Sequence, residues 1–170
     1  MFYLKSTRKG KIKILIFNNM RYLIIALFVF SIVSCKSQHN NLGSDQVVIT
    51  PESRMEWVFG KNYKSYDPTD TDIEAAEKIM RQGYEDQKKE TRNNIGGKSP
   101  DDYNRQYVGA IDENGDKLIY INCFCKKEAE HFKEWKDKIV HVSDGGSCFF
   151  HTTINLTKNK YTNFNINGDA

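Results

Sequence analysis

The C-terminal half of the chain is a series of alternating apolar and polar stretches joined by short connections, and this spacing constrains the fold more than any other feature. The stretches cover residues 106–111, 117–124, 138–143, 148–156 and 161–166. Alternation with a period of two residues predicts strands. Parallel neighbours need a crossover of about a dozen residues or more, and most of these connections are shorter. The sequence therefore predicts an antiparallel meander of four or five strands.

The clearest turn joins the first two predicted strands. Residues 112–116 read Asp-Glu-Asn-Gly-Asp, and an Asn-Gly pair between apolar runs is a strong hairpin signal. The same residues place oxygen ligands at alternate positions, as a calcium loop does. However, the glycine comes too early in the loop, and Cys123 stands where a bidentate glutamate belongs. We therefore interpret this segment as a hairpin, and residues 144–147 (Asp-Gly-Gly-Ser) as a turn rather than an anion site.

One long helix is predicted ahead of the meander, over residues 70–89. Its apolar side chains fall on one face at helical spacing, with charged residues opposite: Ile73, Ala76, Ile79, Met80 and Tyr84. Thr71-Asp72-Ile73-Glu74 predicts a capping box near its beginning, and the alternation over 55–59 predicts a short extended segment before it. The predicted fold is α+β, with one N-terminal helix packed on one face of the antiparallel sheet. This order of elements resembles the cystatin-like arrangement.

The first 34 residues have the pattern of a secretory signal peptide. Residues 22–33 form a mostly apolar run of twelve, shorter than the roughly 20 residues of a membrane-spanning helix and within the range of about 7–15 for a signal peptide. All the charged residues before Cys35 are basic, as expected ahead of such a run. Counted from Met20 the signal has an ordinary length, so we expect Met20 to be the true start.

Ile32-Val33-Ser34-Cys35 resembles the bacterial lipobox. The resemblance implies diacylglyceryl transfer to the Cys35 sulfur, cleavage before Cys35, and acylation of the new N-terminus. Several acyl chains, at about 0.8 kcal/mol per buried methylene, give lasting attachment to a bilayer. An ordinary signal peptide and an uncleaved anchor helix are the alternatives. Residues 36–41 include no acidic side chain, whereas an acidic run directs some lipoproteins to the cell surface. We therefore expect an outer-membrane lipoprotein facing the periplasm.

Removal of residues 1–34 changes the charge of the chain. Six of its 25 basic residues lie there, so 19 basic and 22 acidic residues remain. Because binding to a phosphate backbone needs a broad positive excess, we expect no nucleic-acid partner. Residues 35–53 are polar with little to bury and are interpreted as a flexible tether. Residues 54–170 are interpreted as a single α+β domain.

Most of residues 63–170 are similar to a group of small, uncharacterised bacterial lipoproteins. The stretches that carry this resemblance are SYDPTDTDIEAAEKIM, YNRQYVGAIDENGDKLIYIN, VSDGG and FNINGDA. The resemblance implies a fold and a membrane address, and it transfers no chemistry.

Three cysteines and three histidines of the predicted domain are candidates for a disulfide or a metal site: Cys123, Cys125, Cys148, His131, His141 and His151. Alternation places the three thiols on the more apolar strand faces, so we expect them mainly to fill the core. In an oxidising compartment, a disulfide from Cys148 to Cys123 or Cys125 is the alternative. A metal site is disfavoured, because Cys-x-Cys lacks the gap common in structural zinc sites. His151 is expected on the opposite face, beside Phe149.

The sequence contains no recognisable catalytic motif: neither Gly-x-Ser-x-Gly nor a Cys/His frame is present. No catalytic, cofactor-binding or metal-binding residue is therefore expected. Our first hypothesis is a non-enzymatic module that binds an envelope protein, a peptide or another envelope component through its open sheet face or hairpin loops. The alternative is a binder of a small ligand or metal in a cavity between helix and sheet; an enzyme comes third. A solid core under the helix would favour the first hypothesis, whereas a pocket with converging polar groups would favour the others.

Overall fold

The structure, a computed structural model, describes residues 39, 41–49, 55–90, 95 and 97–168. This part of the chain contains six strands, one long helix and several short helices of one or two turns. In chain order they are β1 (Gln46–Val48), α2 (Met55–Val58), β2 (Lys64–Tyr66), α3 (Asp70–Lys89), η1 (Pro100–Asp102), β3 (Tyr103–Ile111), β4 (Lys117–Cys125), η2 (Lys126–His131), η3 (Gly146–Cys148), β5 (Phe149–Asn155) and β6 (Lys160–Ile166). The predicted signal peptide, Met20 and the lipobox at 32–35 lie outside the described residues.

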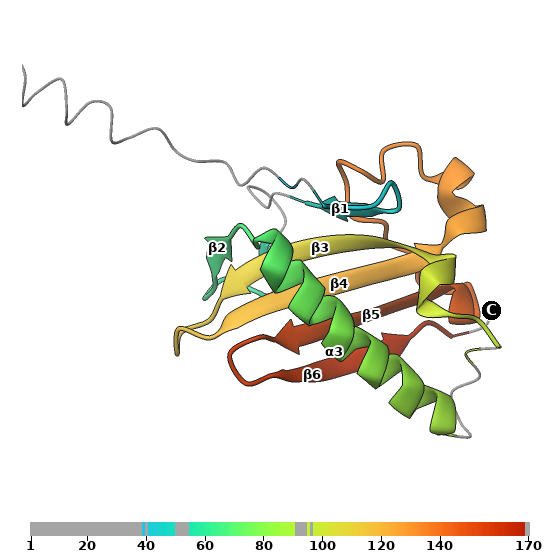
Figure 1. Ribbon diagram of the computed structural model, residues 1–170. Coiled ribbons are helices and arrows are strands. Elements are labelled where there is room, and N and C mark those ends of the chain that lie inside the picture. The colour runs from blue at the N-terminus through green and yellow to red at the C-terminus, as the bar shows by residue number, and fades with distance from the viewer. Residues whose placement is uncertain (1–38, 40, 50–54, 91–94, 96, 169–170) are drawn as a thin grey trace, which may run out of the picture. The chain divides into compact units, whose positions relative to one another are not determined.

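The sheet is mixed, and its main part is the expected meander. Strands β3, β4, β5 and β6 follow one another as antiparallel neighbours (Figure 1). At the outer edge of β3, however, β1 pairs in parallel and β2 pairs antiparallel. The fold class α+β is confirmed, and the prediction of a purely antiparallel sheet is wrong. Because α3 and β2 lie between β1 and β3 in the chain, the connection is long enough for a parallel pair.

The helix α3 forms over the predicted residues and lies across one face of the sheet (Figure 1). Its buried residues are Ile73, Ala76, Met80, Gly83 and Tyr84. They pack against buried side chains of β3, β4 and β5, such as Tyr107, Ile121 and Phe150. Ala76, Met80 and Tyr84 are fully buried, so side chains fill the space under the helix.

The capping box of α3 lies two residues earlier than predicted. Thr69 is the N-cap: its hydroxyl accepts from the backbone N–H of Asp72, and the Asp72 carboxylate accepts from the backbone N–H of Thr69. The Tyr66 hydroxyl donates to the same carboxylate. Thr71 is therefore already inside the helix.

The expected tether contains structure, and the helix is not N-terminal. Within 35–53, β1 pairs with β3, and an imidazole nitrogen of His39 lies 3.0 Å from an Asp70 carboxylate oxygen. The strand was missed because three residues are too few to show a period. Residues 55–58 also form a helical turn rather than an extended segment.

The sheet face opposite α3 is partly covered by the connection between β4 and β5. Residues 138–143 of this connection form no strand, because β4 already pairs with β3 and β5 on its two sides. The segment instead packs on the face: Ile139 contacts a second cluster that includes Ile49, Val108 and Tyr120. The connection begins with the short helix η2, and after it Phe132 and Trp135 place their ring centroids 5.6 Å from that of Phe124.

Two consecutive residues of β3, Arg105 and Gln106, place buried polar side chains on opposite faces of the sheet. Gln106, fully buried, donates to the Trp135 and Lys138 carbonyls and accepts from the Val140 N–H. On the helix side, the guanidinium of Arg105 binds Asp45 at 2.8 Å and Glu77 at 3.1 Å. Gln106 thus holds the β4–β5 connection on the sheet, and Arg105 holds the segment before β1 against α3.

The loop at 112–116 is a hairpin turn, as predicted. The backbone N–H groups of Asn114 and Asp116 donate to a carboxylate oxygen of Asp112, and Gly115 has a φ of 83°. In β6 the backbone is less regular. Asn163 has a φ of 52°, and the register with β5 shifts between His151 and Thr153.

None of the described helices is long and apolar enough to cross a membrane.

Candidate functional site

A pocket opens on the sheet face opposite α3, beside the β4–β5 connection. Its volume is about 290 Å³, near the lower end of the range of about 300–1,000 Å³ for small-ligand sites. The residues around it carry aromatic, aliphatic, amide and imidazole groups, and Phe150 contributes from β5 although its side chain points to the α3 side. They are Trp57, Val58, Tyr120, Asn122, Val140, His141, Val142, Phe149, Phe150, His151 and Asn167. We refer to these residues as the open-face pocket.

Two neighbouring strands form the floor of the open-face pocket. Tyr120 and Asn122 alternate along β4 with the core residues Ile119 and Ile121, so they point away from α3. Asn122 is opposite His151 in the antiparallel register. The expectation that His151 points away from the core is therefore confirmed, and its ring centroid lies 5.5 Å from that of Tyr120.

Side-chain amides fix the wall of the pocket. The Asn122 amide donates to the Val140 carbonyl at 2.8 Å and to the Gln106 side-chain oxygen at 2.9 Å. The Asn167 amide donates to the carbonyls of Val142 and Asp144. These bonds hold the backbone on both sides of His141 at the pocket, through one amide on β4 and one just after the end of β6.

Trp57 lies at the rim. It follows β1 in the chain, in the short helix α2, and 55% of its side chain is exposed, the only large hydrophobic residue this exposed among those described. Its ring meets that of His141 edge to face, with 5.0 Å between centroids. Because more than half of Trp57 is exposed, a ligand in the pocket has an aromatic surface within reach.

The lining of the open-face pocket has no Asp, Glu, Lys or Arg. Its titratable groups are Tyr120, His141 and His151. Burial, together with the nearby His141, lowers the pKa of His151 below its ordinary value of 6.5. At neutral pH, His151 is therefore uncharged, with one ring nitrogen as donor and the other as acceptor.

The lowered pKa of His151 predicts that the protein loses stability on acidification. In the unfolded chain His151 takes up a proton as the pH falls below about 6.5, while in the folded protein it does so only at lower pH. The unfolded state then binds more protons, so the free energy of unfolding falls. We expect urea midpoints to decrease between pH 7.5 and 5.5, and His151→Gln to reduce that decrease. His131→Gln, on the exposed η2, is the matched control; an equal slope in wild type and H151Q would contradict the prediction.

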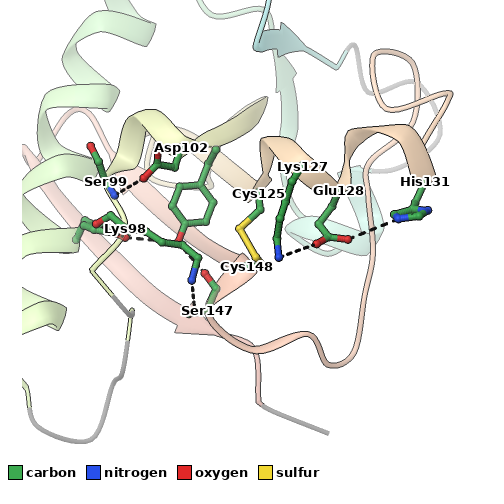
Figure 2. Close-up of a disulfide and its surroundings, with 11 residues drawn as sticks. Lys98, Ser99, Asp102, Cys125, Lys127, Glu128, His131, Ser147 and Cys148 are labelled. Carbon is green, nitrogen blue, oxygen red and sulfur yellow. Dashed lines mark hydrogen bonds and ion pairs between the residues drawn. A yellow bond between two sulfur atoms is a disulfide. The ribbon is translucent and has the colours of Figure 1, made fainter.

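The cysteines do not line this pocket: Cys123 and Cys125 belong to the core on the α3 side of β4, and Cys148 is in η3. Cys125 and Cys148 form a disulfide, with 4.9 Å between their Cα atoms, and Cys123 is a free thiol. Figure 2 shows the bridge where β4 runs into η2, facing η3. Lys98 donates to the Ser147 hydroxyl beside it. The expectation that all three cysteines are free thiols in the core is correct for Cys123 and wrong for Cys125 and Cys148. The disulfide that the sequence left as an alternative is present, and it joins Cys148 to Cys125.

The disulfide closes the long β4–β5 connection, and its loss is expected to lower the free energy of unfolding by about 3 kcal/mol, since a crosslink across a loop of this length restricts the unfolded chain. The variant Cys125→Ser/Cys148→Ser measures this in urea. Thiol labelling of denatured, unreduced protein should find Cys123 reactive and Cys125 and Cys148 protected. Labelling of all three would contradict the pairing.

The histidines and cysteines that the sequence offered as metal ligands do not come together at one site. Burial raises the pKa of Cys123 well above that of an ordinary thiol. His131 is on η2 and Cys123 is on the α3 side of the sheet, while His141 and His151 line the pocket on the other side. Within the described ranges, no group of three or more His, Cys, Asp or Glu side chains has a metal-binding arrangement. Residues 144–147 form a turn into the single-turn η3, with Gly145 in the left-handed region.

The residues of the pocket were mostly missed from the sequence. Trp57 was interpreted as part of an extended segment, and Asn122 and Asn167 carry no recognisable pattern. The only signal was the alternation that placed His151 and Phe149 opposite the core.

Comparison of the chain with protein-family models, with curated proteins and with solved structures found no match.

Proposed function

We propose that this protein is a lipid-anchored, non-enzymatic binding module of the bacterial envelope, and that the open-face pocket is its binding site. The observation that carries the binding role is the exposed ring of Trp57 at a pocket lined with uncharged polar groups. Such exposure of a large aromatic side chain beside a concave site is typical of recognition surfaces.

The location of the pocket changes the second hypothesis, in which a small ligand or metal binds in a cavity between helix and sheet. A ligand cavity directly under the helix is disfavoured, because the residues facing each other there, such as Met80, Tyr107 and Phe150, are 0–2% exposed. The hollows beside α3, of about 370 and 530 Å³, lie along its flanks. The polar groups converge instead on the opposite face. The proposed module therefore combines the two hypotheses, with binding through the open sheet face and a pocket of small-ligand size.

The proposed anchor is the acylated Cys35, in the outer membrane facing the periplasm. The Cys125–Cys148 disulfide supports export, because disulfides persist in oxidising compartments. We expect wild-type cells to incorporate labelled palmitate into the protein and Cys35→Ala cells to incorporate none. Cys123→Ala is the matched control, since Cys123 is buried. Labelling of C35A would contradict the proposed anchor.

The cystatin-like arrangement remains part of the proposal. A long helix across an antiparallel meander supports it, while β1, β2 and the parallel pairing at β3 are additions to that plan.

Binding is tested with the emission of Trp57 in the Trp135→Phe background, where Trp57 is the remaining tryptophan. We expect fractions of a bacterial envelope extract to shift this emission. The shift should be lost in the additional variant Asn167→Ala, in the pocket wall, and retained in the control Lys127→Ala on the exposed η2. A fraction series without any pocket-dependent shift would contradict the binding role.

A further inference from the structure

We propose that the open-face pocket binds a neutral saccharide, with one sugar ring of the ligand seated against Trp57. This inference rests on the proposed function and names the ligand class of the same site. It is carried by the charge, the hydrogen-bonding groups and the location of the pocket.

The exposed indole supplies a surface for a sugar ring. An aromatic face carries the negative part of the ring quadrupole. One face of a pyranose presents several C–H groups with a small positive charge, so it packs favourably on such a ring. Because the edge-to-face contact with His141 orients Trp57, less rotamer freedom is lost when a ligand binds.

The amides of the pocket supply oriented acceptors for hydroxyl groups. Asn167 directs its NH2 to two carbonyl oxygens, and Asn122 directs its NH2 to a carbonyl and to the Gln106 side-chain oxygen. Since only an NH2 group donates to these oxygens, the orientation of both amides is determined. Neither amide oxygen accepts a hydrogen bond from another described residue, so both are available to ligand hydroxyls.

The remaining polar groups both donate and accept, as hydroxyl recognition requires. Neither the Tyr120 hydroxyl nor the His141 ring has a hydrogen bond among the described residues. His151 is uncharged at neutral pH and lies 3.3 Å from the Asn165 amide. A charged ligand would meet no counter-charge in the lining, and its desolvation would be uncompensated. The pocket therefore favours a neutral, hydroxyl-rich ligand.

The location of the pocket disfavours an extended peptide. Peptides that add to a sheet bind at an edge, where backbone groups are unpaired. Here the floor is formed by β4 and β5, each paired on both sides. The pocket thus offers side chains rather than backbone groups, and its volume of about 290 Å³ is small. A sugar ring at the end of a glycan or in a short oligosaccharide fits these limits.

The test uses the full lipidated chain, carrying Trp135→Phe, in a detergent without a sugar head group. The probes are neutral hexoses, N-acetylhexosamines, 6-deoxyhexoses, pentoses and their oligomers, together with uronic acids and uncharged peptides. We expect a neutral saccharide to shift the Trp57 emission and to give saturation-transfer NMR signals at millimolar concentration. Uronic acids and peptides should bind more weakly.

Variants separate the site from general binding. Asn167→Ala, read by emission, and Trp57→Ala, read by NMR, should each weaken saccharide binding by about tenfold or more. Lys127→Ala should bind as wild type, and circular dichroism of each variant verifies its folding.

The possible outcomes separate the inference from the proposed function. Saccharide binding that Asn167→Ala leaves unchanged would overturn the assignment of the ligand to this pocket. Absence of binding across the neutral panel, with pocket-dependent binding of a peptide or a charged ligand, would overturn the saccharide and leave the binding module standing. Absence of every pocket-dependent signal, including that of envelope fractions, would overturn both.

Discussion

Replacing Gln106 with leucine is expected to lower the free energy of unfolding by about 4 kcal/mol. Leucine has a similar size, so the loss comes from hydrogen bonds rather than from a cavity. The Val140 N–H and the carbonyls of Trp135 and Lys138 would lose their partner on the sheet. Val140 is only 7% exposed, so water does not replace the missing bond without local opening. The connection that forms the pocket wall should then detach.

Urea unfolding measures this loss, and amide hydrogen exchange at Val140 should accelerate by orders of magnitude. Asn104→Leu is the matched control on the same strand face. Asn104 is 5% exposed, and its amide nitrogen has no hydrogen-bond partner among the described residues. Removing it should therefore be neutral or stabilising. A loss of similar size in N104L and Q106L would show that burial of leucine on this face, rather than the bonds of Gln106, determines the effect.

Replacing Arg105 with methionine is also expected to cost about 3 kcal/mol, because it removes the most buried cation that pairs with Glu77 and Asp45. The cations that remain beside these two carboxylates, Arg81 and Lys126, are much more exposed. The Arg105 side chain is 6% exposed and that of Glu77 is 12% exposed. The Tyr107 hydroxyl would remain as a donor to Glu77 at 2.7 Å, which limits the loss but does not neutralise the charge. Since Asp45 is the second partner, the segment before β1 should separate from the sheet first.

Arg81→Met provides the comparison for Arg105. Arg81 also pairs with Glu77, at 3.6 Å, but its side chain is 41% exposed. Solvent screens such pairs, so we expect a loss of about 0–1 kcal/mol in urea unfolding. Limited proteolysis should cleave R105M near residues 41–49 faster than wild type. Equal losses in R81M and R105M would contradict the role assigned to burial.

The main elements were predictable because their signals are local. The apolar stripe on α3 and the Asn-Gly hairpin each depend on residues close in the chain, and both formed as expected. Strand alternation likewise placed β3 to β6 in order and directed His151 away from the core. The period of the apolar residues shows which face of a helix or strand is buried, and that period depends only on residues within the same element.

The features that were not predictable depend on distant partners. The segment 138–143 alternates like a strand, yet no edge of β4 is free for it, and the bonds of Gln106 hold it in another conformation. Strand β1 is too short to be recognised without β3 beside it. Trp57 and the amides that form the pocket meet from three separate parts of the chain, so no spacing in the sequence indicates the site.

The irregular backbone of β6 affects how neighbouring copies of the protein can interact when they are close together. Long, regular outer strands recruit a strand from another molecule, which leads to chain-to-chain polymerisation. The left-handed Asn163 and the register shift interrupt β6, and three-residue strands cover β3 at the opposite end of the sheet. A lipid anchor would concentrate copies of this protein in the plane of a membrane. With both borders of the described sheet interrupted in this way, the sheet offers such neighbours no long, regular edge for strand pairing.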